Sequence, residues 1–73
     1  MDIAIIFGKL LREERIKKSI TQEELSHLCE LDRTYISLLE RGLRQPSIKT
    51  LFSLSSALDI KASTIIIELE NRL

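Results

Sequence analysis

The sequence predicts an all-α fold of five helices. Short polar clusters interrupt the chain every dozen or so residues, and the apolar residues between them recur at helical spacing. Only two glycines and one proline occur, and 44% of the 73 residues are hydrophobic. This composition is typical of a folded, helix-rich chain rather than of a disordered tail.

The chain length is enough for one domain, and we treat residues 1–73 as a single unit. A chain this short buries only about 60% of the surface that its unfolded form exposes, so its own core should be marginal. Marginal stability favours association with a second copy. Apolar surface that remains exposed after folding is therefore a candidate interface with a second copy.

Cysteine use and hydropathy predict a cytoplasmic protein without a membrane partner. Cys29 is the one cysteine and has no internal disulfide partner, and we recognise no secretory leader. The apolar runs are far shorter than the roughly 18 residues that a membrane-spanning helix needs.

Catalytic and metal-binding patterns are not recognised either. His27 and Cys29 have no second pair at ligand spacing, so we expect no metal. With one histidine, one cysteine and no glycine-rich phosphate loop, we expect no enzyme and no cofactor.

Capping residues define the helix boundaries. Thr21 and Glu24 form a predicted capping box, Asp32 and Ser47 are predicted N-caps, and Gly42 can end a helix in the left-handed conformation. The expected helices cover residues 3–18, 22–29, 33–41, 48–58 and 62–73. Their expected core faces contain Ile3, Phe7, Leu10, Leu11, Leu25, Leu28, Ile36, Leu39, Leu51, Leu54 and Leu58.

The second and third helices are short and separated by a tight turn at Glu30 and Leu31, which predicts a helix-turn-helix unit. In this unit the first two turns of the second helix reach base edges in the major groove of double-stranded DNA. Those turns contain Arg33, Thr34, Tyr35, Ser37 and Leu38. Arg33 can donate two hydrogen bonds to guanine, whereas the Tyr35 ring either packs on the domain or contacts a thymine methyl or a flexible base step.

The charge distribution agrees with a DNA partner. The whole chain has a formal net charge of zero, but residues 32–49 contain four cations and two anions. A local basic strip of this kind can engage phosphates. We expect Arg44, Ser47 and Lys49 at the DNA backbone or, for Arg44, at the minor groove.

Three strings carry a family resemblance: residues 21–26, 31–37 and 39–42 read TQEELS, LDRTYIS and LERG. Together they resemble the lambda-repressor-like (Cro or XRE-type) helix-turn-helix family over nearly the whole chain. The resemblance implies a compact five-helix DNA-binding domain. It also implies base reading by Arg33, Thr34, Tyr35 and Ser37, a phosphate or supporting contact by Gln22, and an internal ion pair between Arg15 and Glu40.

Within that family, the stand-alone length and the strings LDRTYIS and ERGLR resemble the controller proteins of restriction–modification systems. This narrower likeness implies a homodimer that binds operator DNA and regulates its own and neighbouring genes. A phage-type repressor or an antitoxin-like regulator would have much the same sequence. Two positions depart from the family pattern: Glu30 stands where many members have glycine, and Ser26 where many have a smaller residue or alanine.

The last helix has more apolar residues than one core face needs, and we expect a dimer interface there, formed by Ile65, Ile66, Ile67 and Leu69. Glu23 and Glu24 are either an acidic surface for RNA polymerase or, for Glu24, simply the capping residue. The rival from another class is a helical protein-interaction module that does not bind DNA. Salt-dependent binding to duplex DNA separates the two.

Overall fold

The computed structural model describes residues 2–73, which form five α-helices and no strand. In chain order they are α1 (Ile3–Lys17), α2 (Gln22–Cys29), α3 (Arg33–Glu40), α4 (Ile48–Ala57) and α5 (Ala62–Arg72). Each helix begins and ends within one residue of its expected bounds, so the all-α, five-helix prediction is confirmed. Within residues 2–73 no single helix could cross a membrane by length and hydropathy; α4 and α5 meet that test only as a pair, bent by 109°.

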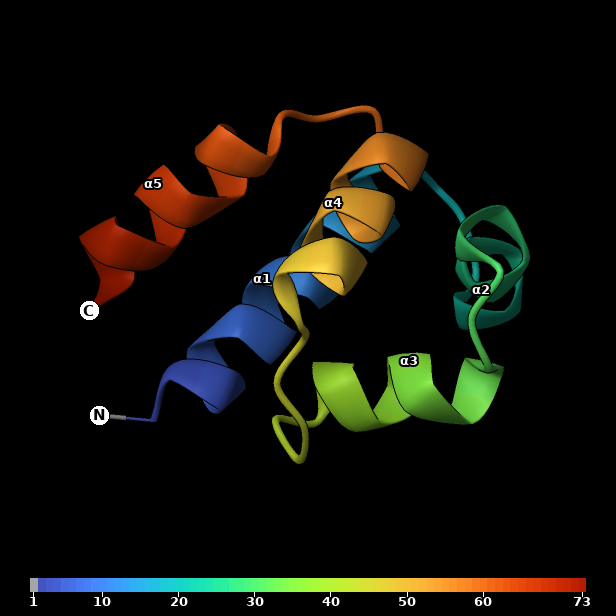
Figure 1. Ribbon diagram of the computed structural model, residues 1–73, viewed down its shortest axis with the longest axis horizontal. Coiled ribbons are helices and arrows are strands. Elements are labelled where there is room, and N and C mark those ends of the chain that lie inside the picture. The colour runs from blue at the N-terminus through green and yellow to red at the C-terminus, as the bar shows by residue number, and fades with distance from the viewer. Residues whose placement is uncertain (1) are drawn as a thin grey trace.

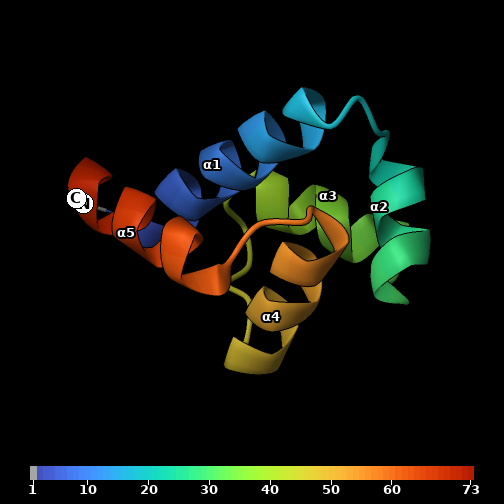
Figure 2. The ribbon, with the colours of Figure 1, turned by 90° about the horizontal axis from the view of Figure 1, so that it is seen from above.

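Helix α1 organises the packing (Figure 1). It contacts α3 on one side and α5 on another, while α4 contacts α2 and α5 (Figures 1 and 2). Helix α3 also contacts α2, which completes the helix-turn-helix pair. The largest fully buried side chains come from α2, α3 and α4 and the residue after α4: Leu25, Ile36, Leu39, Leu54 and Leu58.

Two expected core residues are not buried, and for them the prediction was wrong. Ile3 is 41% exposed because it lies in the first turn of α1, beside a surface hollow rather than under another helix. Leu28 is 61% exposed because it lies on the outer side of α2, between two surface hollows. Helical spacing alone did not distinguish these positions from covered ones.

The expected N-caps are present. The Thr21 hydroxyl accepts from the Glu24 amide at 3.0 Å, and the Glu24 carboxylate accepts from the Thr21 amide at 2.8 Å, which completes the capping box. Asp32 and Ser47 cap α3 and α4 through the amides of Thr34 and Thr50. These bonds account for the sharp starts of the helices.

Four helices end in the same way, although only one ends at a glycine. A residue in the left-handed conformation follows each of them, and the next amide donates to the carbonyl five residues earlier, as in a Schellman motif. The left-handed residues are Ser19, Glu30, Gly42 and Asp59. An apolar residue then follows in each case: Ile20, Leu31, Leu43 and Ile60.

Helix α5 lies against the rest of the domain through Ile65 and Leu69, which are buried in the core of the single chain. The expectation that both face a second copy was therefore wrong: they fill the seam with α1 and α4. At the end of α5, Arg72 makes two hydrogen bonds to Glu13 of α1 at 2.7 and 3.2 Å. This contact lowers the pKa of Glu13 and raises the pKa of Arg72.

Helix α1 approaches the backbone of α3 closely at Gly8. A Cβ atom there would lie 2.4 Å from the Leu39 carbonyl oxygen and 2.6 Å from that of Glu40. Both obstacles are backbone atoms, so no side chain can move aside. Glycine at this position lets α1 rest directly on the last turn of α3.

We predict that Gly8→Ala destabilises the domain by about 1–3 kcal/mol, the usual cost of forcing extra volume into a packed contact. The direction of the change in stability is informative, because replacing glycine by alanine within a helix would otherwise stabilise the fold by about 1 kcal/mol. Chemical unfolding followed by circular dichroism measures the difference, with Lys9→Ala on the exposed side of α1 as control. A Gly8→Ala variant as stable as the control would mean that α1 and α3 do not meet this closely.

Candidate nucleic-acid interface

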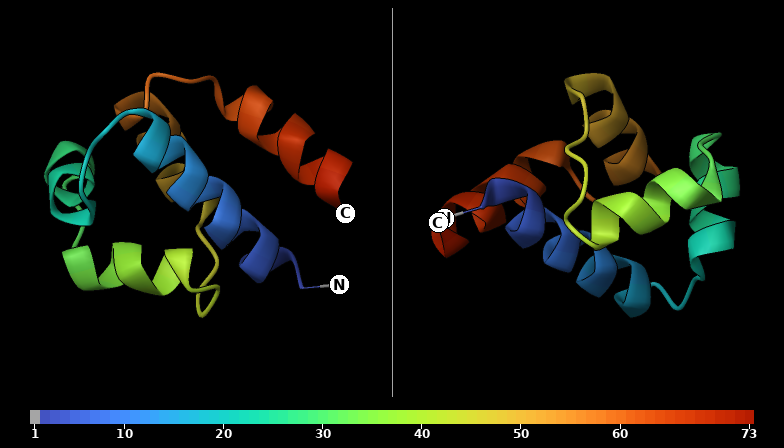
Figure 3. Two further views of the ribbon diagram at one scale, coloured as in Figure 1. Left: turned by 180° about the vertical axis from the view of Figure 1, so that it is seen from behind. Right: turned by 90° about the horizontal axis from the view of Figure 1, so that it is seen from below.

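Helix α3 lies along one edge of the molecule, and no other helix covers its outer side (Figures 1 and 3). Arg33 and Thr34, in its first turn, are exposed, and Ser37 is half-buried one turn later. With Gln22 of α2 they line a shallow hollow of about 160 Å³. The structure thus brings together four residues that the sequence analysis assigned to DNA contact.

A buried ion pair between α1 and α3 underlies this surface. The Arg15 guanidinium donates to the Glu40 carboxylate through Nε at 2.6 Å and through Nη2 at 3.1 Å. Its Nη1 donates to the Ile20 carbonyl at 2.8 Å, and the Gln22 amide donates to Glu40 Oε1 at 3.1 Å. The ion pair that the resemblance implies is therefore present, and it also connects α1 to the start of α2.

Burial makes this pair costly to break. The Glu40 side chain is 3% exposed and that of Arg15 is 12% exposed. Hydrogen bonding to Glu40 raises the pKa of Arg15 although burial acts in the opposite direction. Removing one partner would strand the other charge in the interior, at a cost of about 3–5 kcal/mol.

The turn before α3 is regular despite its departures from the family pattern. Glu30, which stands where many family members have glycine, adopts φ 56° and ψ 38°, a left-handed conformation that is unfavourable for a non-glycine residue. The Leu31 amide donates to the Ser26 carbonyl at 2.9 Å, and the buried Ser26 hydroxyl donates to the Glu23 carbonyl at 2.6 Å. The Ser26 hydroxyl is thus hydrogen-bonded within its own helix. The bond from the Leu31 amide closes the turn and offsets the cost of the left-handed conformation at Glu30.

The other predicted contact residues differ in exposure and in whether their side chains already have partners within the domain. Arg44 and Lys49 are exposed and, within residues 2–73, neither they nor Arg33 form an ion pair. Tyr35 is half-buried and packs against the core, which is one of its two expected positions. The Ser47 hydroxyl donates to Thr50 Oγ1 and accepts from the Thr50 amide, so it caps α4, and its contact with the DNA backbone stays a prediction.

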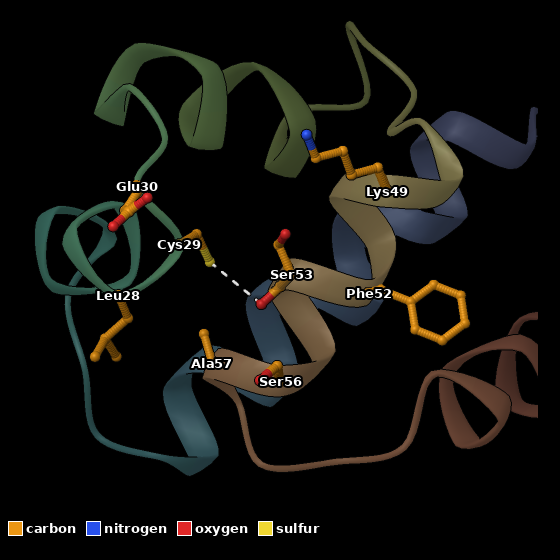
Figure 4. Close-up of a pocket in the computed structure, with 8 residues that line it drawn as sticks. All are labelled: Leu28, Cys29, Glu30, Lys49, Phe52, Ser53, Ser56 and Ala57. Carbon is orange, nitrogen blue, oxygen red and sulfur yellow. Dashed lines mark hydrogen bonds between the residues drawn. The ribbon is translucent and has the colours of Figure 1, made fainter.

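A wider hollow of about 840 Å³ lies between α2 and α4 and adjoins Lys49 (Figure 4). The Cys29 thiol at its base donates to the Ser53 carbonyl at 3.7 Å, and burial raises its pKa, so it is not an activated nucleophile. Sequence reasoning missed the exposure of Phe52 at this rim and the Gln22–Glu40 bond. Nothing in the order of residues indicates a side-chain contact across 18 positions.

Comparison with known proteins places this geometry in a family. Residues 11–65 match the family described as helix-turn-helix. Because this match covers most of the chain, the chain belongs to that family, in its Cro and XRE-type branch. It is a DNA-binding transcriptional regulator.

Several similar proteins control restriction–modification systems. Control protein C.BamHI of Bacillus amyloliquefaciens is 38% identical over 66 residues, which cover 89% of this chain and 82% of that protein. The crystal structure of the restriction–modification controller C.AhdI from Aeromonas hydrophila is 40% identical with a TM-score of 0.82, covering 85% of this chain and 94% of that one. The C.Esp1396I tetramer in complex with its natural 35-base-pair operator is 30% identical with a TM-score of 0.86, covering 97% and 93%.

Proposed function

We propose that this protein is the controller of a restriction–modification system, which binds operator DNA as a homodimer and regulates its own and neighbouring genes. The observation that carries the proposal is the uncovered edge where Gln22, Arg33, Thr34 and Ser37 surround one hollow. Similarity to controller proteins over most of both chains supports the regulatory role. A footprint on the DNA upstream of its own gene tests it, since protection should occur there and fall with salt as phosphate contacts are screened.

Rival functions make different predictions for that footprint. A protein-interaction module would show no salt-dependent protection of any duplex. A phage-type repressor or an antitoxin-like regulator would protect DNA, but beside phage or toxin genes instead of restriction and methylation genes. The neighbouring genes therefore separate the regulators from one another.

The cations of the interface should contact different parts of the DNA. Arg33 opens α3, where the helix dipole disfavours a cation and where a guanidinium can contact guanine O6 and N7. Lys49 lies in the first turn of α4 and suits a phosphate instead. Arg44, in the loop before α4, can approach the backbone or the minor groove, while Thr34 and Ser37 offer hydroxyls to bases.

We predict that Arg33→Ala removes about 1–3 kcal/mol of preference at one base pair in each half-site. Lys49→Ala should instead weaken binding to all duplexes alike and reduce the salt dependence by about one phosphate contact. Titrations of the operator, its single-base variants and random duplex at several salt concentrations measure both effects. Lys61→Ala is the control, because the loop before α5 lies opposite α3 (Figure 1). If Arg33→Ala keeps the wild-type base preferences, Arg33 does not read sequence.

A second copy of the chain is the proposed partner at α4 and α5. Ile66 and Ile67 remain exposed in α5, and Ile48 and Phe52 add two exposed apolar side chains one turn apart on α4. Ile48 and Ile66 line the same apolar hollow. A dimer formed here would present two α3 helices about one DNA turn apart, roughly 34 Å, to a near-palindromic site.

The dimer predicts a concentration-dependent mass in sedimentation experiments. Ile66→Glu should leave a folded monomer, because it places a carboxylate in the apolar contact. Ile16→Glu, at an even more exposed isoleucine of α1, should remain dimeric. A wild-type mass that stays monomeric at all micromolar concentrations would contradict this interface.

Glu23 is the carboxylate that we propose for contact with RNA polymerase. It is exposed on α2, whereas the Glu24 carboxylate is engaged in the capping box. Glu23→Gln should therefore lower activated transcription with purified polymerase without changing operator affinity. Glu24→Gln is the matched control, since glutamine preserves the capping box. Unaltered activation in Glu23→Gln would exclude this contact.

A further inference from the structure

One side chain both donates a hydrogen bond to the buried ion pair and lines the proposed DNA surface. Gln22 lines the hollow with Arg33, and its Nε2 atom donates to Glu40 Oε1 at 3.1 Å. The same oxygen accepts from Arg15 Nη2 at 3.1 Å. The base of the proposed DNA surface is therefore bonded to the interior of the domain.

The hydrogen bond to Glu40 determines which end of the Gln22 amide faces the interior. An ionised carboxylate only accepts hydrogen bonds, so the group that faces Glu40 is the NH₂ group and not the carbonyl. Arg15 donates to both oxygens of this carboxylate, so Arg15 and Gln22 share Glu40 as their acceptor. The carbonyl oxygen and the second N–H of Gln22 are then left for partners other than Glu40.

The backbone at the start of α2 is held by the same network. Arg15 Nη1 donates to the carbonyl of Ile20, two residues before Gln22, at 2.8 Å. One guanidinium thus holds both the chain entering α2 and the carboxylate that holds the Gln22 side chain. Glu40 itself is too buried to meet DNA, so any effect it has on binding passes through other residues.

We infer that Glu40 is a positioning residue for DNA recognition, which holds the Gln22 amide in its binding orientation before DNA arrives. This inference rests on the proposed function. A side chain that is already ordered loses little rotamer freedom on binding, so preorganisation favours the complex. Without the carboxylate, Gln22 would have to be ordered by the DNA itself.

A double-mutant cycle on operator affinity tests the inference. Glu40→Gln keeps the shape of the side chain but cannot supply the charged acceptor shared by Arg15 and Gln22. It should lower operator affinity about five- to tenfold, as expected for ordering one flexible side chain. In a Gln22→Ala background the same change should cost less than about twofold, because the residue that Glu40 positions is gone. In a Gln45→Ala background, which alters an exposed glutamine outside the network, the full effect should remain.

A measurement on the wild-type chain keeps the test independent of how well the variants fold. The side-chain NH₂ signals of Gln22 in nuclear magnetic resonance should show restricted motion in the free protein and little change in mobility with operator. A mobile Gln22 amide in the free protein would overturn the inference. So would a Glu40→Gln effect that is undiminished by Gln22→Ala while the wild type binds operator. Failure of the wild type to bind any duplex would instead overturn the proposed function.

Discussion

The contact between the end of α3 and the middle of α1 determines the geometry of the whole domain. Gly8 lets the two backbones approach each other at Leu39 and Glu40, and about two turns further along α1 Arg15 binds the Glu40 carboxylate. The carboxyl end of α3 is thus held on α1. Its amino end follows α2 directly and carries the exposed Arg33 and Thr34, and α3 lies along one edge of the molecule (Figure 1). The carboxyl end of α3 is therefore fixed, while the exposed side chains of its first turn are available to a groove.

The placement of the acidic residues explains how a chain of zero net charge can engage DNA. Glu40 is paired inside the domain, Glu24 caps α2 and Glu13 binds Arg72 at the end of α5. Arg15 and Arg72 thus neutralise Glu40 and Glu13, and backbone hydrogen bonding holds Glu24 at the start of α2. The cations Arg33, Arg44 and Lys49 have no such partner within residues 2–73, so they can meet phosphates or bases.

The sequence predicted helix bounds well because caps are local signals, as at Thr21 and Asp32, whose hydrogen bonds span two or three residues. It failed at Ile3 and Leu28 because helical periodicity shows which residues share a face, not which face another helix covers. The same limit explains why all the isoleucines near residue 65 looked available to a partner. Burial of Ile65 depends on where α5 crosses α1 and α4.

The residues of the candidate site were predictable, but their connection was not. Arg33, Thr34 and Ser37 follow from their place in the first turns of the second motif helix. The family resemblance implied the Arg15–Glu40 ion pair, but no sequence pattern predicted the hydrogen bond from the Gln22 amide to Glu40. The left-handed conformations at Ser19 and Asp59 were not predicted either, because glycine, the usual signal for such a helix end, is absent there.

The most direct test of this account is a nuclear magnetic resonance titration of the labelled chain with operator duplex. The amide signals of residues at the starts of α2 and α3, Gln22, Arg33 and Thr34 among them, should shift most on binding. The Arg15 side-chain signals should persist with their bond to Glu40 intact. If the largest shifts instead fall on α1 and the loop before α5 while the start of α3 is unaffected, α3 does not enter the groove and the account is wrong.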